Sequence, residues 1–242
     1  MKKLVLLFLV NILASFFFLL HAQSNFTGWL ATFNTFKTGK KTSIHADVQL
    51  RSTGEIRQIQ TFLIRSGLNV HLNKHLTVTA GYAFISNKRT INTVNGFAPE
   101  HRVWEQLLAN HKLKNLFISH RFRLEQRFIA KSIVINNELE SDGSLYANRF
   151  RYFIRNILPF KNEPAFKKGL FAALQNEVFL NIGNSSAVNN EVFDQNRLYL
   201  AIGYRLNAGF DLEGGYMNQY INGRNKAFTN NHILQLAWYM RL

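Results

Sequence analysis

The sequence contains no cysteine and only 3 prolines among its 242 residues. The absence of cysteine excludes a disulfide framework, a cysteine metal cluster and lipid attachment at a processed cysteine. Long apolar runs are also missing after residue 20, so no later segment is long enough to cross a membrane as a helix. Any crossing by the rest of the chain must therefore be made by strands.

The one long apolar run, Leu4 to Leu20, follows two lysines and precedes the small residue Ala22. This order of charge, apolar segment and small residue is typical of a secretory signal peptide. A run of about 17 residues is also borderline for a permanent transmembrane helix, but its internal polar residues and the small residue favour cleavage. We expect residues 1–22 to be a cleaved signal peptide and 23–242 to form the mature domain.

Positive charge predominates, because 29 Lys and Arg outnumber 14 Asp and Glu. The formal net charge of +15 falls to +13 once Lys2 and Lys3 leave with the signal peptide. Such an excess often indicates nucleic-acid binding, but an exported chain does not routinely meet nucleic acid, so we expect no such partner. Its anionic neighbours should be lipid phosphates and small anionic solutes. The sequence has no motif for a metal, cofactor or phosphate loop, so we predict none of these.

Aromatic residues are plentiful, with 22 Phe, 8 Tyr and 3 Trp, and this composition favours strands. Over most of the chain, apolar and polar residues alternate with a period of two. In residues 116–128, Arg121, Arg123, Glu125 and Arg127 share one face, opposite a mainly apolar face. A helix would spread these four charges over more than half of its circumference, so the pattern predicts a strand.

Alternation alone fits either a soluble sandwich, whose apolar faces meet in a core, or a membrane barrel, whose apolar faces meet lipid. The signal peptide, an apolar face on the last strand and alternating loop lengths favour the barrel. Short turns are expected at 73–75, 111–115 and 207–209, and longer connections at 87–99, 130–145, 182–194 and 221–229. The connection at 158–168 is an exception, because it is long although it should lie at the end of the barrel that carries the short turns. We predict an outer-membrane protein of a Gram-negative bacterium, surrounded by outer-membrane lipid and inserted by the barrel-assembly machinery.

The fold class predicted is all-β: an up-and-down antiparallel transmembrane β-barrel of 10–12 strands, with the last strand closing on the first. The pattern contains eleven candidate segments, but bacterial single-chain barrels normally have an even number of strands. We therefore favour twelve strands. Those eleven candidate segments are 26–36, 43–51, 59–72, 76–86, 100–110, 116–128, 146–156, 169–181, 193–206, 209–220 and 229–242.

The pairing register of two hairpins can be predicted from the sequence. A three-residue loop at 207–209, with Gly209 in a left-handed conformation, would pair Leu206 with Phe210, Arg205 with Asp211 and Tyr204 with Leu212. The loop at 73–75 would pair Leu72 with Leu76 and Val70 with Val78. A slip of one residue would break both matches, because it would move every side chain to the other face.

Six short segments of the chain carry a further signal: 100–106 (EHRVWEQ), 121–128 (RFRLEQRF), 149–152 (RFRY), 176–179 (NEVF), 195–198 (QNRL) and 215–217 (GYM). Together they resemble the uncharacterised outer-membrane family called domain of unknown function 2490. The R-x-R-x-E-x-R core within 121–128 is the most specific of these segments, and the resemblance covers nearly the whole mature chain. It implies an outer-membrane barrel and no established activity, substrate or catalytic residue.

Charged residues on the predicted inner face are the best functional lead. They could form a basic lumen that selects anionic solutes, as arginine rings do in anion pores. Alternatively, they pair across strands and fill a barrel too narrow for a water channel, and the small strand number favours this second interpretation. The residues are Arg121, Arg123, Glu125, Arg127, Arg149, Arg151, Arg155, Glu177, Arg197, Arg205, Asp211 and Glu213.

An alternative function is a barrel-embedded lipid hydrolase that uses Ser and His. Ser119 and His120 are adjacent, but on a strand they face opposite sides and cannot form a nucleophile–base pair. His120 and His232 should face lipid. We therefore predict no catalytic residue, and we assign the three tryptophans Trp29, Trp104 and Trp238 to the interfacial aromatic girdle.

Overall fold

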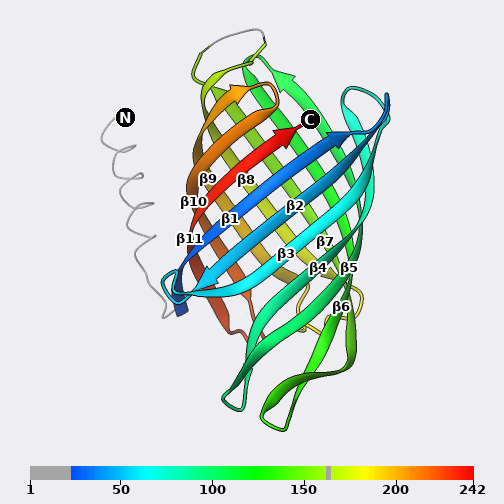
Figure 1. Ribbon diagram of the computed structural model, residues 1–242, viewed down its shortest axis with the longest axis vertical. Helices are drawn as coiled ribbons and strands as arrows, with labels where there is room; N and C mark the ends of the chain where they lie inside the picture. Colours follow the sequence, from blue (N-terminus) through cyan, green and yellow to red (C-terminus); the bar gives the residue numbers. More distant parts are fainter. Residues whose placement is uncertain (1–22, 162–164) are drawn as a thin grey trace, which may run out of the picture.

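Eleven strands, taken in chain order, form one closed β-barrel in the computed structural model, which describes residues 23–161 and 165–242 (Figure 1). The predicted signal peptide lies outside the described residues. The strands are β1 (Gln23–Lys37), β2 (Thr42–Thr53), β3 (Gln58–His71), β4 (Leu76–Ile91), β5 (Val94–Leu113), β6 (Leu116–Ile135), β7 (Glu138–Pro159), β8 (Gly169–Ile182), β9 (Phe193–Asn207), β10 (Phe210–Asn222) and β11 (Phe228–Arg241).

Every strand pairs antiparallel with its neighbours in the chain, and β1 closes the barrel by pairing parallel with β11. The all-β barrel and the closure of the last strand on the first are confirmed. The preference for twelve strands is wrong, because each of the eleven segments with alternating polarity becomes one strand. In an up-and-down barrel an odd number makes the first and last strands run in the same direction, so the closing pair has to be parallel.

The outer face of the wall is largely apolar, whereas the inner face carries the buried charged residues together with aromatic and some aliphatic side chains. On β9, Leu198, Leu200 and Ile202 are 49%, 60% and 52% exposed, whereas the alternate residues Tyr199 and Ala201 are 0% and 3% exposed. Since successive side chains of a strand point to opposite faces, this pattern fixes the orientation of the strand. On β9 the leucine and isoleucine side chains therefore point away from the lumen, which is the reverse of their orientation in a soluble sandwich.

Two connections that the sequence analysis predicts as long loops are instead strand hairpins. β4 and β5 continue to a tight turn at Asn92 and Thr93, with φ of 47° and 73°, and β6 and β7 to one at Asn136 and Asn137, with φ of 50° and 64°. Two successive positive φ values suit the tight turns that match strand twist. Both hairpins extend beyond the rest of the wall, at the lower end of Figure 1. Polar residues on both faces of these extensions hide the alternation in the sequence.

The predicted register holds in both short hairpins away from the turn itself. Val70 pairs with Val78, and Arg205 pairs with Asp211. Next to the second turn, however, Phe210 pairs with Asn207, not Leu206, because the register shifts there. Gly209 is not among the residues with positive φ. It is needed for a different reason, since an added Cβ would lie 2.9 Å from the Arg241 carbonyl oxygen.

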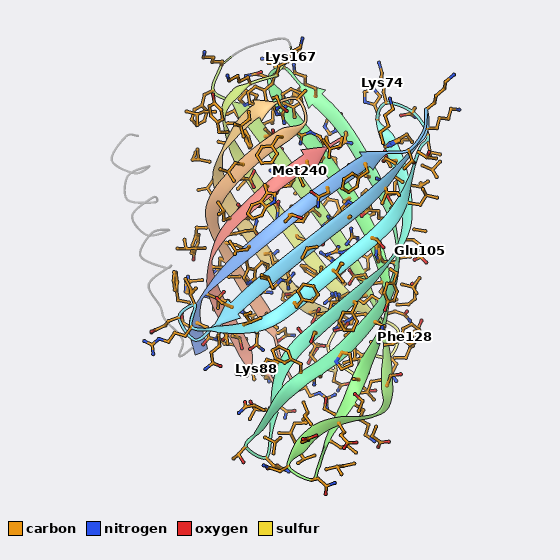
Figure 2. All side chains as sticks on the ribbon, in the orientation of Figure 1. Lys74, Lys88, Glu105, Phe128, Lys167 and Met240 are labelled. Carbon is orange, nitrogen blue, oxygen red and sulfur yellow. The ribbon has the colours of Figure 1, made fainter. Side chains whose placement is uncertain are left out.

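The connection between β7 and β8 lies at the same end of the barrel as the short turns, as the meander requires. Figure 2 shows Lys74 and Lys167 at this short-turn end. Phe166, in the described part of the connection, is 6% exposed and packs edge-on against Phe171 with ring centroids 5.9 Å apart. The connection therefore contributes a side chain to the barrel interior. Within the described chain, no helix is long and apolar enough to cross a membrane.

Candidate functional site

The structure places all twelve predicted charged residues on the inner face of the barrel. Ten of them are at most 9% exposed, and Arg121 and Arg205 are partly exposed. This placement follows from the period of two, because each of these residues is separated from its like-facing neighbours on a strand by an even number of positions. Their partners, in contrast, come mainly from other strands.

Glu125 on β6 is the centre of the largest cluster. Its carboxylate accepts hydrogen bonds from Arg149 Nη2 at 2.7 Å and from Arg151 Nη1 at 2.5 Å. Arg102 Nη1 and Arg123 Nη1 lie 3.6 Å and 3.9 Å from it. The Glu125 side chain is 3% exposed. One buried carboxylate thus lies among four guanidinium groups from β5, β6 and β7.

Glu177 on β8 extends the cluster to the next strands. Its Oε1 accepts from Arg121 Nη2 at 2.6 Å and from Arg151 Nη2 at 2.7 Å. Arg151 therefore bridges Glu125 and Glu177. Charge-assisted hydrogen bonds of this kind are about twice as strong as neutral ones, so the two carboxylates hold three neighbouring strands in one geometry.

The other predicted residues form smaller pairs. Arg205 donates two hydrogen bonds to Asp211, at 2.7 and 2.9 Å, and one to the Phe166 carbonyl at 2.9 Å. Arg155 pairs with Glu213, which also accepts from the Tyr239 hydroxyl. The Arg205–Asp211 pair is the one that the hairpin register predicts. These contacts tie the short-turn end of β9, β10 and β11 together.

The charged interior includes residues that the sequence analysis did not select. Arg127 pairs with Glu100, and Arg149 with Asp194, while Arg65 lies 3.3 Å from Asp47. Arg51 lines the same interior. The alternation along each strand could have identified these residues, because each falls on the inward face of its strand. The charged network is therefore larger than the predicted set.

Trp29 and Trp104 do not belong to an outer aromatic girdle, so that assignment is wrong for these two residues. Both point inward, with exposures of 7% and 0%. Arg123 lies over the Trp104 ring at 4.3 Å and Arg51 over the Trp29 ring at 4.0 Å. Gly81 makes room for Trp104, because an added Cβ would approach its ring to 2.5 Å. The inner tryptophans therefore fill space beside the arginines.

A cavity of about 390 Å³ remains inside the barrel. Seven arginines but only three carboxylates line it. It reaches the short-turn end, where Met240 and Arg241 belong to its lining. Figure 2 shows Met240 near that end, at the end of β11. The cavity is thus basic and is bounded by side chains of the charged network.

Histidines on the outer face are bonded to tyrosines. His120 Nδ1 lies 2.9 Å from the Tyr152 hydroxyl, and His232 Nδ1 lies 2.5 Å from the Tyr216 hydroxyl. Ser119 lines the inner cavity, on the opposite face from His120. The outer face therefore carries no Ser–His pair at this position. In the described ranges, no group of three or more His, Asp or Glu side chains could hold a metal ion.

Glu105 is an exception on the apolar outer face. It points outward from β5 and accepts a hydrogen bond from Gln126 at 3.2 Å. Figure 2 shows it about halfway along the wall. A groove beside it is otherwise lined largely by apolar side chains of β3 to β7, among them Leu107 and Phe122.

Comparison with known proteins agrees with the resemblance found in the sequence. The family model described as protein of unknown function (DUF2490) matches residues 26–230. An uncharacterised protein of Methylorubrum extorquens is 24% identical over 199 residues, which cover 81% of this chain and 79% of that protein. The matched region begins in β1 and ends in β11, so it includes all twelve charged residues predicted from the sequence. The chain belongs to this family of proteins of unknown function.

Proposed function

We propose that this protein is an outer-membrane β-barrel of a Gram-negative cell whose lumen is closed by paired charges and aromatic side chains. The observation that carries the proposal is the inverted polarity of the wall, with apolar residues outside and arginines and carboxylates inside. Such a wall is stable when lipid covers its outer face, because the closed hydrogen-bonded sheet leaves no edge unpaired. In water the same face would expose apolar surface all round the molecule.

Closure of the lumen is supported by the burial of the inner side chains. Trp104, Tyr199 and Phe179 are 0% exposed, and Arg123 is 1% exposed. Barrels of about eight strands are filled by side chains, whereas open water channels are typical of sixteen or more. Eleven strands lie near the lower end of this range, so a filled interior is the expected outcome.

A narrow anion pathway is the second candidate. The basic cavity at the short-turn end favours it, because arginines without an equal number of carboxylates attract anions. Continuous passage would require the layer that contains Trp104 and Arg123 to move aside. A lipid hydrolase receives no such support, since Ser119 faces the cavity and His120 is bonded to Tyr152 on the outer face.

Planar-bilayer recording separates these proposals. The closed barrel predicts that purified, refolded protein inserts without discrete conductance steps. An open narrow pore predicts steps with anion preference that disappear when Arg123 and Arg151 are neutralised. Folding of the barrel is checked by gel mobility, because a closed barrel in detergent migrates differently before and after heating. A protein that stays soluble and monomeric without detergent would contradict the membrane assignment.

A further inference from the structure

Two lumenal arginines have no carboxylate partner. No carboxylate oxygen of the described residues lies within 4.0 Å of the Arg51 or Arg197 guanidinium, although the other arginines of the network form such pairs. Arg51 Nη2 donates to the Gln49 amide oxygen at 2.7 Å, and Arg197 Nη2 to the Gln195 amide oxygen at 3.4 Å. Arg51 Nε is buried without any acceptor in the described chain. With its amide in the orientation that satisfies its neighbours, Gln219 also accepts from Arg197 Nε and Nη2, both at 3.2 Å. Neutral amides are thus the hydrogen-bond partners of both cations, and no contacting carboxylate balances either charge.

Each of the two guanidinium groups lies over the same aromatic ring inside the cavity. Arg51 lies 4.0 Å and Arg197 5.0 Å from the centre of the Trp29 ring. Trp29 and Arg51 are direct partners across β1 and β2. Arg197 is buried and Arg51 is partly buried. Two cations in one cavity, neither in contact with a carboxylate, favour a bound anion that supplies the missing counter-charge.

The part of the cavity wall formed by β1 and β11 includes aromatic side chains that suit an apolar group. Phe33 and Tyr239 stack with ring centroids 4.9 Å apart, and Met240 lines the mouth beside them. Thr35, near the mouth, is six residues along β1 from Trp29, a distance of roughly 20 Å along a strand. A ligand could therefore place its charged end at the arginines and its apolar body along the aromatic side chains.

We propose that Arg51 and Arg197, on either side of the β1 and β11 closure, form a binding site for a small organic oxyanion, a phosphoryl or carboxylate group on an apolar body. The guanidinium fork matches such groups with two parallel hydrogen bonds, which gives the site its preference over neutral molecules. The cavity of about 390 Å³ lies in the size range of small-molecule sites. This inference rests on the closed, charged lumen proposed above and assigns a ligand class to it.

Calorimetric titration of the refolded protein in non-ionic detergent tests the site, with phenyl phosphate as the probe. We expect saturable binding by the wild type and a loss of at least about tenfold in affinity in the Arg51→Gln/Arg197→Gln double variant, since each charge-assisted hydrogen bond contributes about 1.5 to 3 kcal/mol. Benzyl alcohol, the neutral analogue, should bind the wild type at least about tenfold more weakly. This comparison tests the site without any substitution.

Arg57→Gln is the matched control, because it removes the same charge from a side chain that is 79% exposed in the β2–β3 turn. It should leave the affinity unchanged. No saturable binding of phenyl phosphate to the wild type, or equal affinity in the double variant, would overturn the proposal. Tighter binding of short-chain phosphatidic acid than of phenyl phosphate would support the site and identify lipid as its source of phosphate. A protein that shows the heat-dependent shift in gel mobility but does not bind phenyl phosphate would overturn the ligand site alone, whereas absence of that shift would count against the closed barrel.

Discussion

Removing the charge of Glu125 should destabilise the barrel severely. Glu125→Gln keeps the shape of the side chain but leaves Arg149 and Arg151 without one of their carboxylate partners, at contacts of 2.7 and 2.5 Å. Arg102 and Arg123 lose the same neighbour. Breaking a buried ion pair by removing one partner costs about 3 to 5 kcal/mol, because an uncompensated charge stays buried. Arg149 and Arg151 retain Asp194 and Glu177, so we expect about 3 kcal/mol.

The free energy of unfolding can be measured by guanidinium titration of the protein in lipid vesicles, with tryptophan fluorescence as the signal. Glu55→Gln is the matched control, because Glu55 pairs with Arg57 at the surface, where the side chains are 72% and 79% exposed. Surface pairs contribute about 1 kcal/mol or less. If Glu125→Gln were no more destabilising than this control, the charged interior would be hydrated and open, and the closed-lumen proposal would be refuted.

Three further outcomes follow from the same packing. Gly203→Ala should destabilise the barrel by about 1 to 3 kcal/mol in the same titration, because its Cβ would lie 2.2 Å from Phe171. Gly214→Ala, whose Cβ would have its nearest neighbour at 4.0 Å, should have little effect. Equal effects of the two substitutions would contradict the close contact between Gly203 and Phe171. Glu105→Leu should raise stability in vesicles by about 1 kcal/mol if lipid covers the outer face, and a loss of stability would indicate a polar partner there. Trp104→Gly should produce conductance steps in a bilayer that is silent with the wild type, and continued silence would place the barrier elsewhere.

The strand segments and their faces could be predicted from the sequence because a period of two is a local property. The same rule placed Arg123 and Glu177 inside. It did not identify their partners, since contacts such as Arg149 with Asp194 join strands that are neither adjacent in the chain nor registered by a short turn. The exception, Arg205 with Asp211, spans a tight hairpin whose register the turn determines.

The strand number and the placement of two tryptophans differ from the prediction because there a general rule takes precedence over the local alternation of residues. An even strand number was favoured over the eleven segments that the sequence itself contains. Trp29 and Trp104 were assigned by residue type to a girdle, although their strand positions put them on the inner face. The hairpin extensions beyond residues 86 and 128 escape the sequence pattern because both of their faces mix polar and apolar residues, so alternation no longer marks a strand.

The orientation of the wall is tested most directly by single cysteines, which the chain permits because it has none of its own. Spin labels at residues 196 to 206 of β9 can be compared in lipid vesicles for collision with oxygen, which concentrates in lipid, and with a water-soluble nickel complex. The barrel proposed here predicts oxygen access at Leu198, Leu200 and Ile202, and little access to either reagent at Tyr199 and Ala201. Access of the nickel complex to Leu198, Leu200 and Ile202 would contradict it, because the apolar face would then meet water.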